Sequence, residues 1–486
     1  MTVNDIIVIL PSIILIAWSL VSLVVDLWIP RDRKGITALM AAFGLAVSLG
    51  VTLALGSNGA RFAPGFNGMA VLDGFAVFAN LLLLGSGLLG IALAFDYNRR
   101  MGIDRSEYYV LLMISTAGMM LMVQAFDLIV VFLALEMLSI PLYVLAGFAR
   151  PQVSSEESSL KYFILGAFAS AIFLYGAALI YGGTAHTDFT GIVNAVRSGG
   201  PNTNIAFVTV GGALLLVGLA FKVAAVPFHM WTPDVYQGAP SPVTAWMAVS
   251  VKVAALAALM RVFVVAFPSL AAGFQPVLWG LAALTMVVGN LVAMVQKNIK
   301  RLLAYSSIAH VGYLLMAFVP YGNGEVVSSA ISATLFYLLG YGLASFAAWG
   351  VVIAAEQAEG RGLDLEDYAG LGRKYPWMGI AMMVAMFSFT GIPMTLGFWG
   401  KFYVFQSAVR GGAAGLALIG LLASLFSAFY YLRVLVVMYM RPGEPAIRQE
   451  GWLSLVTIAS AAAVVLLAFV PGPVFNMAAQ AFLHLP

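Results

Sequence analysis

The sequence predicts an all-α polytopic membrane protein, and three observations lead to this fold class. Hydrophobic residues make up 62% of the 486 residues, whereas Asp, Glu, Lys and Arg together make up only 9%. The mean hydropathy of +0.98 excludes an ordinary soluble domain. The apolar runs are long and continuous, which favours helices over a β-barrel, because barrel strands alternate over ~10 residues.

A requirement of ~20 apolar residues per crossing predicts about 14 spans. Pro227 and Pro393 break the seventh and the twelfth, because an internal proline removes a backbone hydrogen bond. Only Gln124 and Asp127 mark the boundary between the fourth and fifth spans. The first span is expected to be retained, since MTVND offers no basic segment before it. The predicted spans are 6–27, 36–55, 72–95, 107–124, 126–147, 158–183, 205–237, 242–268, 274–296, 302–319, 326–355, 376–410, 413–440 and 452–470.

Lysine and arginine are distributed unevenly among the predicted loops. Loops after even-numbered spans hold only Arg61, Arg197 and Arg410. The positive-inside rule places the other, basic loops in the cytoplasm. Both termini are therefore expected on the opposite face of the membrane. The basic loops contain Arg31, Arg33, Lys34, Arg99, Arg100, Arg105, Arg150, Lys161, Lys297, Lys300, Arg301, Arg361, Arg373, Lys374, Arg441 and Arg448.

The two proline breaks lie five spans apart, and this spacing suggests an internal repeat. Two units of five helices have opposite orientations in the membrane, because five is an odd number of crossings. The predicted repeats are residues 107–268 and 269–440. An N-terminal three-helix segment, 1–106, precedes them, and a last helix with a tail, 441–486, follows.

The composition also limits the chemistry of this chain. It has no cysteine, which excludes disulfides and thiolate-ligated iron–sulfur clusters. The four histidines lack the spacing of a haem or zinc site, and no nucleotide-binding glycine motif is present. We therefore expect no cofactor and no metal in this chain, and any redox chemistry must take place in other proteins.

Two lysines, Lys222 and Lys252, lie near the centres of neighbouring spans. A charge there costs at least ~2.5 kcal/mol, so such a residue is a functional candidate. Burial disfavours the ammonium form, and a nearby carboxylate restores it, so each lysine could bind and release a proton. In the competing interpretation, each lysine extends its side chain to place the ammonium at the membrane surface. Both lysines lie too near the centres of their spans for the side chain to reach that far.

Glu136 is the clearest intramembrane acid, and it shares a helix face with Ser139 and Tyr143. Two interpretations remain open for it. The carboxylate pairs with a lysine and locks two helices together, or it changes proton occupancy and tunes that lysine.

Three further residues are candidates for proton transfer. Lys401 follows the break in the twelfth span and is the equivalent lysine of the second unit. His310 lies one turn from Ser306 and Ser307, and a histidine can relay protons near neutral pH. His229 follows the first break. For both histidines the competing interpretation is a buried residue whose ring nitrogens are hydrogen-bonded and which has only a structural role.

The remaining polar positions favour structural interpretations. Asp234 and Tyr236 occupy a turn and are expected to cap a helix or close a cavity. Arg261 and Arg433 lie nearer helix ends. The segment 356–375 is the one mixed-charge loop, and it is either solvated or in contact with a partner.

Two long motifs resemble a known family. FKVAAVPFHMWTPDVYQGAPSPVTAWMAVSVKVAA and KNIKRLLAYSSIAHVGYLLMA look like the antiporter-like membrane subunits of respiratory complex I. These subunits are similar to the large subunits of multisubunit cation/proton antiporters. The resemblance covers about spans 4–13. Two features distinguish the chain from other subunits of this family. It lacks the long lateral helix that extends one of them, and its twelfth span carries Lys401 where a second is expected to carry glutamate.

The resemblance implies which residues carry protons. The central polar axis of the family falls on Glu136, Lys222, Lys252 and Lys401, and His310 matches a position that links the axis to one side of the membrane. It also implies that flavin, iron–sulfur clusters and quinone belong to partner subunits, and that the other membrane subunits of the complex and the lipid bilayer are the partners.

The function expected from the sequence is therefore proton translocation driven by quinone reduction in other subunits. Two alternatives remain open at this point. One is a subunit of a multisubunit sodium/proton antiporter, and the other is a membrane scaffold that does not pump.

Overall fold

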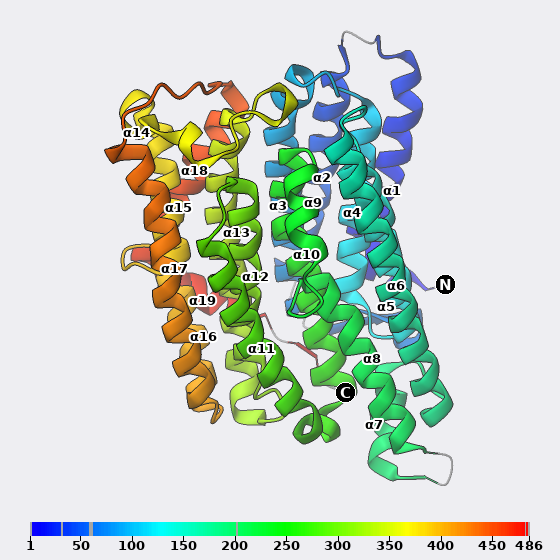
Figure 1. Ribbon diagram of the computed structural model, residues 1–486. Coiled ribbons are helices and arrows are strands. Elements are labelled where there is room, and N and C mark those ends of the chain that lie inside the picture. Colours follow the sequence, from blue (N-terminus) through cyan, green and yellow to red (C-terminus); the bar gives the residue numbers. More distant parts are fainter. Residues whose placement is uncertain (1, 31–32, 58–61, 201–202, 482, 485–486) are drawn as a thin grey trace.

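The computed structural model is a bundle of helices (Figure 1), and it describes residues 2–30, 33–57, 62–200, 203–481 and 483–484. The first ten helices are α1 (Val3–Val25), α2 (Gly35–Ser57), α3 (Gly74–Arg100), α4 (Ser106–Gln124), α5 (Leu128–Ala146), α6 (Val153–Thr184), α7 (Phe189–Ser198), α8 (Ile205–Val223), α9 (Trp231–Gly238) and α10 (Ser241–Met260). The others are α11 (Ala271–Met294), α12 (Ile299–Phe318), α13 (Gly324–Ala355), α14 (Leu371–Lys374), α15 (Pro376–Thr390), α16 (Leu396–Arg410), α17 (Ala414–Met440), α18 (Gly451–Leu466) and α19 (Pro471–Ala479). A hairpin of β1 (Phe62–Gly65) and β2 (Ala70–Asp73) precedes α3.

The expected all-α membrane fold is confirmed. Within the described residues, 13 helices are long and apolar enough to cross a membrane. The broken pair α15 and α16 supplies one more crossing, in agreement with the predicted number. The boundary between the fourth and fifth spans is also confirmed, because Asp127 caps α5 by accepting hydrogen bonds from the amides of Ile129 and Val130. The hairpin, α7 and α19 were not predicted.

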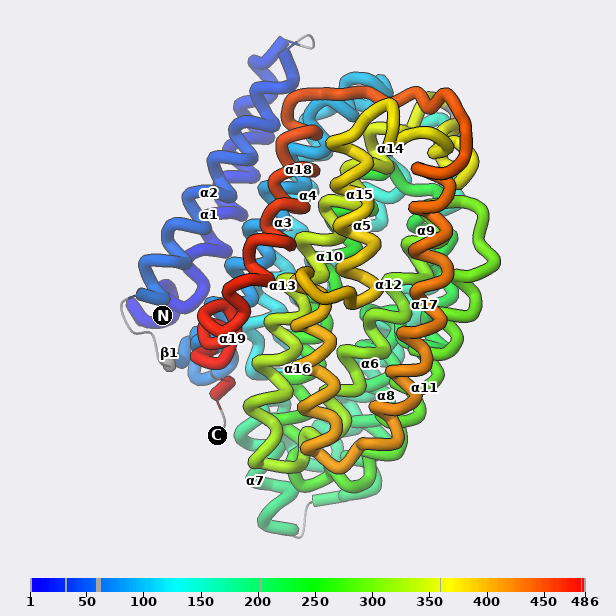
Figure 2. The backbone as a smooth tube through the Cα atoms, turned by 90° about the vertical axis from the view of Figure 1, so that its left-hand side faces the viewer, coloured from blue at the N-terminus to red at the C-terminus, as the bar shows by residue number. Residues whose placement is uncertain are grey.

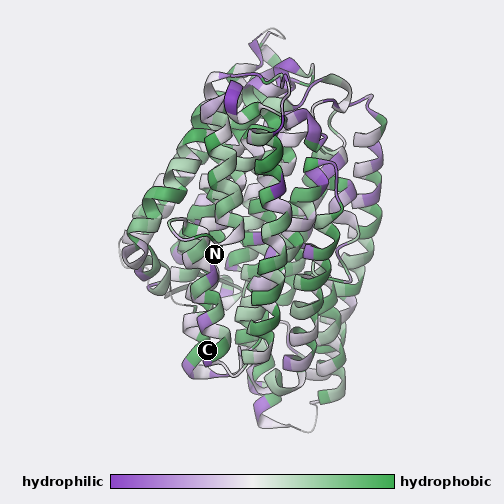
Figure 3. Ribbon diagram, turned by 60° about the vertical axis from the view of Figure 1, so that its left-hand side comes forward, coloured by the Kyte–Doolittle hydropathy of each residue, from purple (hydrophilic) through white to green (hydrophobic). Residues whose placement is uncertain are grey.

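The most buried helices are α10, α12 and α13, and every residue of α10 is buried. Figure 2 shows α1 and α2 at one edge of the bundle and α11 and α17 at the other. Hydrophilic residues gather toward the ends of the bundle, most densely at one end (Figure 3). The same end carries α14, whereas α7 lies at the opposite end (Figure 1). Of the basic residues used for the topology, Arg31 and Arg61 lie outside the described residues.

Both expected helix breaks are present. α8 ends at Val223, Ala224 adopts a left-handed φ of 67°, and α9 begins only at Trp231. The break begins at Ala224, because Pro227 in a continued helix would clash with the carbonyl of Val223, four residues earlier. Thr285 of α11 accepts a hydrogen bond from the freed amide of Val226 at 2.9 Å, so the break is satisfied by a neighbouring helix.

The second break separates α15 from α16 over residues 391–395. Gly391 has a φ of 87°, and Pro393 lies within the break. In Figure 1, α8 leads up to α9, whereas α15 leads down to α16. The two broken helices therefore run in opposite directions.

A buried ion pair joins the N-terminal helices to the core, and the sequence did not predict it. Arg261, directly after α10, donates to both oxygens of Asp73 at 2.9 Å, and the two side chains are 1% and 0% exposed. Its Nε donates to the carbonyl of Val123 at 2.8 Å. Asp73 also caps α3, and it accepts the backbone amide of His484. One carboxylate thus ties together α3, α10 and the C-terminal tail.

We predict that Arg261→Met destabilises the protein by about 3–5 kcal/mol, because it leaves the Asp73 carboxylate buried without its counter-ion. Thermal unfolding of the purified protein in detergent, followed by tryptophan fluorescence, measures the effect. Adding Asp73→Asn should recover part of the loss, since Asn still caps α3 and carries no charge. An Arg261→Met protein that unfolds at the wild-type temperature would contradict the assignment.

Candidate functional site

Lys222 ends in a pocket of hydroxyl groups. Its side chain leaves the last turn of α8, is 3% exposed, and donates to Ser139 of α5 at 2.7 Å and to Tyr162 of α6 at 3.3 Å. The ammonium also lies 5.2 Å from the ring centre of Tyr162 and 5.8 Å from that of Tyr143, at distances where aromatic faces attract cations.

The close packing of α6 on α8 brings these groups together. A Cβ atom on Gly176 would lie 2.7 Å from the carbonyl of Gly211, and a Cβ on Gly211 would lie 2.7 Å from the carbonyl of Gly176. Glycine at both positions lets the two backbones touch, as small residues do at membrane helix interfaces. Tyr162 can therefore reach the amine of Lys222 across a narrow gap.

Glu136 lies near Lys222 but does not bond to it. None of the ion pairs within 4.0 Å in the described residues joins the two side chains, although the carboxylate acts on Lys222 electrostatically. Its Oε1 is buried without a hydrogen-bond partner. In this conformation Ser139, one turn further along α5, takes the position at the ammonium in place of the carboxylate.

Lys252 lies at the middle of the fully buried helix α10. Its Nζ donates to the hydroxyl of Tyr236 at 3.0 Å, and the side chain is 3% exposed. Tyr236 comes from α9, the second part of the broken helix, and its ring packs edge-on against Trp231 and Trp349. The sequence predicted that this tyrosine caps a helix or closes a cavity, and it did not predict the contact with the buried lysine.

Polar contacts continue from Tyr236 toward His310. The side chain of Tyr236 interacts with Ser307 of α12, and Ser307 bonds to the hydroxyl of Tyr341 at 2.7 Å. The ring of Tyr341 lies 5.0 Å from the ring of His310. Hydroxyl groups therefore lead from Lys252 to Tyr341, whose ring contacts the histidine.

His310 is bonded at both ring nitrogens. Nδ1 lies 2.5 Å from the hydroxyl of Tyr337, and Nε2 lies 3.2 Å from that of Tyr431. Tyr431 also bonds to Ser306. The histidine is 3% exposed and close enough to Lys252 and Lys401 to interact electrostatically with both. It thus lies between the lysines of the two predicted repeats.

Lys401 extends from α16 back toward the second break. Its Nζ donates to the carbonyl of Thr390, the last residue of α15, at 2.9 Å and to Ser424 of α17 at 2.7 Å. The ammonium lies 4.8 Å from the ring centre of Tyr313. The broken helix supplies a free carbonyl, and this carbonyl is the ligand of the buried lysine.

Four of the predicted residues therefore share one environment. Lys222, Lys252, His310 and Lys401 are buried, bonded mainly to hydroxyl groups, and none belongs to an ion pair of the described residues. Such groups can hold a proton and pass it to a neighbouring hydroxyl. Sequence reasoning named Tyr143 and Tyr236 but missed the tyrosines around His310, although the four-residue spacing of Tyr337 and Tyr341 places both on one face of α13.

The other polar candidates lie outside this series. His229 is half-buried in the first break, and its Nδ1 has no hydrogen-bond partner. Asp234 bridges Lys161 and Arg301 at 2.8 and 2.7 Å. Arg433 donates to the carbonyls of Met294 and Gln296 and so caps the C-terminal end of α11.

Two residues assigned to loops are buried. Lys300, predicted to lie in a loop, is in the first turn of α12 and is 1% exposed. Glu356 begins the segment predicted to be solvated or in contact with a partner, and it is buried at the C-terminal end of α13. In the part of the chain that the structure describes, no cluster of three or more histidine or acidic side chains could hold a metal ion.

Comparison with known proteins identifies the family. Residues 125–427 match the family described as "NADH:quinone oxidoreductase/Mrp antiporter, TM". NADH-quinone oxidoreductase subunit N of Trichlorobacter lovleyi is 42% identical to this chain. The match covers 98% of this chain and 96% of the length of that relative.

Solved structures agree with this assignment. A chain of "Respiratory complex I from Thermus thermophilus with bound Aureothin" is 38% identical, with a TM-score of 0.81, over 96% of this chain and 99% of that one. A chain of the Mrp complex from Dietzia sp. DQ12-45-1b has a TM-score of 0.85 over 99% of this chain and 97% of that one, but at 20% identity it shares only the fold. The resemblance inferred from the two sequence motifs is confirmed: the chain belongs to the subunit N family of NADH-quinone oxidoreductase and is a membrane subunit of that respiratory complex.

Proposed function

We propose that this subunit translocates protons along an axis of Glu136, Lys222, Lys252 and Lys401, with His310 between the last two lysines. The observation that supports this most directly is the set of three buried lysines, bonded to hydroxyls rather than paired with carboxylates. A structural lysine at this depth would be expected to have a carboxylate partner, because an unpaired ammonium is costly there. A permanent carboxylate partner would stabilise the ammonium form and so oppose loss of the proton.

The separation of Glu136 from Lys222 suggests how the first step is controlled. In this conformation Ser139 and Tyr162 hold the amine, and the carboxylate acts only through space. Approach of Glu136 stabilises the ammonium form, and its withdrawal releases the proton toward Lys252. The Tyr236 hydroxyl and the hydroxyls around His310 then connect Lys252 to Lys401.

The driving energy comes from partner subunits. Moving one charge against a membrane potential costs about 2.3 kcal/mol per 100 mV. In this proposal the redox reaction that supplies the energy takes place in other subunits. Flavin, iron–sulfur clusters and quinone belong to the neighbouring subunits, where quinone reduction is expected to bias the position of Glu136.

The proposed topology follows the distribution of lysine and arginine. The end of the bundle that carries α14 faces the cytoplasm of a bacterium, and both termini face the periplasm. Residues 107–268 and 269–440 form two five-helix units of opposite orientation, with 1–106 before and 441–486 after them. The opposite directions of the two broken helices support this division.

We predict that Lys222→Met abolishes proton pumping in the assembled complex while the subunit still folds, since methionine fills the same space without an ionisable group. Quenching of a pH-sensitive dye in inverted membrane vesicles energised with NADH measures pumping. Lys374→Met is the matched control, because Lys374 forms an exposed ion pair with Glu444. Normal pumping by the Lys222→Met complex would refute the axis and favour a scaffold.

We also predict that Tyr236→Phe slows pumping severalfold without loss of stability. Phenylalanine keeps the ring contacts with Trp231 and Trp349 but removes the hydroxyl bonded to Lys252. Tyr321→Phe is the control, since Tyr321 is a buried tyrosine whose hydroxyl donates to the carbonyl of Phe267 and not to a lysine of the axis. Equal pumping rates in the two variants would exclude Tyr236 from the proton path.

A further inference from the structure

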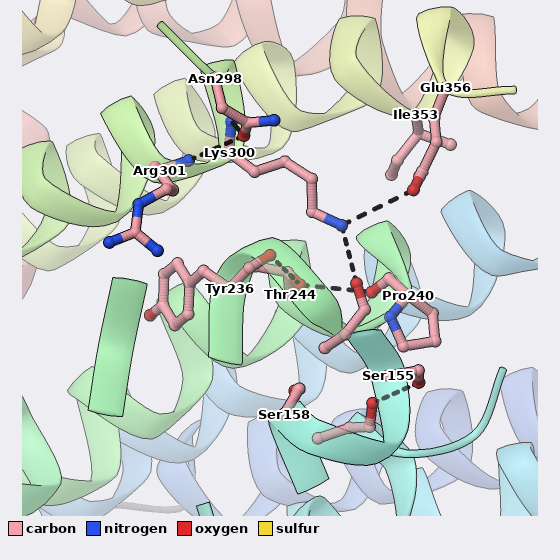
Figure 4. Close-up of polar contacts among 12 residues, drawn as sticks. Ser155, Ser158, Tyr236, Pro240, Thr244, Asn298, Lys300, Arg301, Ile353 and Glu356 are labelled. Carbon is pink, nitrogen blue, oxygen red and sulfur yellow. Dashed lines mark hydrogen bonds and ion pairs between the residues drawn. The ribbon is translucent and has the colours of Figure 1, made fainter. Parts of the chain in front are cut away.

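A second buried charged group lies outside the proposed axis, where α12 begins and α13 ends. Lys300 Nζ is 3.6 Å from Glu356 Oε1, and the two side chains are 1% and 7% exposed. The same ammonium donates to the carbonyl of Ala239, just before α10, at 2.7 Å. Figure 4 shows the lysine stem reaching across the start of α10 toward the carboxylate.

Charged and titratable groups from several elements surround Glu356. Arg100 of α3 donates to the carbonyls of Ile353 and Glu356 and pairs with Glu450 at 2.7 Å. Tyr97, one turn earlier on α3, interacts with the carboxylate, and Tyr368 acts on it electrostatically. Lys300 faces the same carboxylate from α12.

Several polar atoms in this region are buried without a protein partner. They are Glu356 Oε2, Glu450 Oε2, Arg100 Nε, Tyr368 Oη and Ser241 Oγ. Buried polar groups are normally hydrogen-bonded, and internal water is the usual partner where protein atoms are not available. One oxygen of Glu356 lies 3.6 Å from its counter-ion, and the other has no partner. A pair with this geometry stabilises the fold weakly. The carboxylate is better suited to accept a proton from water.

The position of the pair relative to α12 and α13 indicates where such a proton would go. Three polar contacts cross the seam between these antiparallel helices. They are Lys300 with Glu356, Ser307 with Tyr341 and His310 with Tyr337. The seam therefore leads from one end of the bundle to the histidine between Lys252 and Lys401.

The first and second contacts are separated by seven residues along α12 and by fifteen along α13, or about 10 and 22 Å. Side chains from α13 and α9 occupy this interval. Ser345 interacts with Tyr341, and Trp349 packs 6.2 Å from the ring of Tyr236. Tyr236 also binds Lys252. Movement of the Trp349 and Tyr236 rings would therefore connect the Lys300–Glu356 pair to the axis or separate it from the axis.

We propose that Glu356 takes up protons from the cytoplasmic side for this subunit, and that the seam between α12 and α13 delivers them to His310. The inference rests on the proposed function and on the proposed topology. A proton from water forms an O–H bond at Glu356 Oε2, and that bond breaks again as the proton passes into the seam. Lys300, held by the Ala239 carbonyl, stays charged and returns Glu356 to its ionised form.

The test uses the complete respiratory complex in inverted vesicles, whose outer surface is the cytoplasmic face. The variants are Glu356→Gln, the matched control Glu444→Gln, and Lys222→Met. Glu444 is a fully exposed acid whose hydrogen bond from Lys374 holds its pKa below the ordinary value, so it is ionised like a surface carboxylate. The rates of proton pumping and of NADH oxidation are measured across a pH series, with and without added formate.

We expect Glu356→Gln to slow pumping severalfold, since a positioned proton-transfer group contributes roughly 10²-fold or more to its step. The loss should grow as pH rises and protons become scarce, and formate, a small proton carrier, should restore much of the rate. Glu444→Gln should behave as wild type. Lys222→Met should not respond to formate, because its defect lies inside the axis.

The outcomes separate the two proposals. If Glu356→Gln matches Glu444→Gln, or if formate does not rescue it, Glu356 is not the uptake group, whatever Lys222→Met does. If Lys222→Met pumps normally, the axis itself is wrong. Should Glu356→Gln fail to assemble, the double variant Lys300→Met with Glu356→Gln removes both charges of this buried pair. Slow, formate-rescued pumping in that double variant supports the proposal, and wild-type pumping overturns it.

Discussion

The cost of an ammonium group at membrane depth is the constraint on which this structure depends. Lys222, Lys252 and Lys401 each have too little exposure to be solvated, and none has a carboxylate partner within 4.0 Å in the described residues. Hydroxyls, a backbone carbonyl and aromatic faces contact them instead. These ligands stabilise a charge less strongly than a carboxylate does, so the protonated and neutral forms of each lysine are closer in free energy than in an ion pair.

The breaks in the two discontinuous helices provide part of this environment. An unbroken helix uses its own carbonyls, whereas α15 ends at Thr390 and leaves that carbonyl for Lys401. The first break turns α9 so that Tyr236 faces Lys252. Proline at each break thus has two consequences: it ends a helix, and it creates ligands for a buried lysine.

The permanent ion pairs lie elsewhere and have a different geometry. Arg261 and Asp73 form a bidentate pair with 2.9 Å contacts, which suits a lock between α3 and α10. Lys300 and Glu356 are more loosely paired and leave one oxygen unpartnered. The contrast between these two buried pairs, and not burial alone, distinguishes a structural pair from one that exchanges protons.

Sequence by itself determined the all-α membrane fold, the spans, the two breaks and the lysines, because hydrocarbon requires ~20 apolar residues per crossing and makes every buried charge conspicuous. It also placed Ser139 and Tyr143 beside Glu136, since helical periodicity is local. The contacts of those residues were decided by tertiary structure. Ser139 lies 83 residues from Lys222, and Asp73 lies 188 from Arg261. Only packing, such as the glycine contact of α6 with α8, could select hydroxyl partners for the lysines and bury Lys300 and Glu356 together.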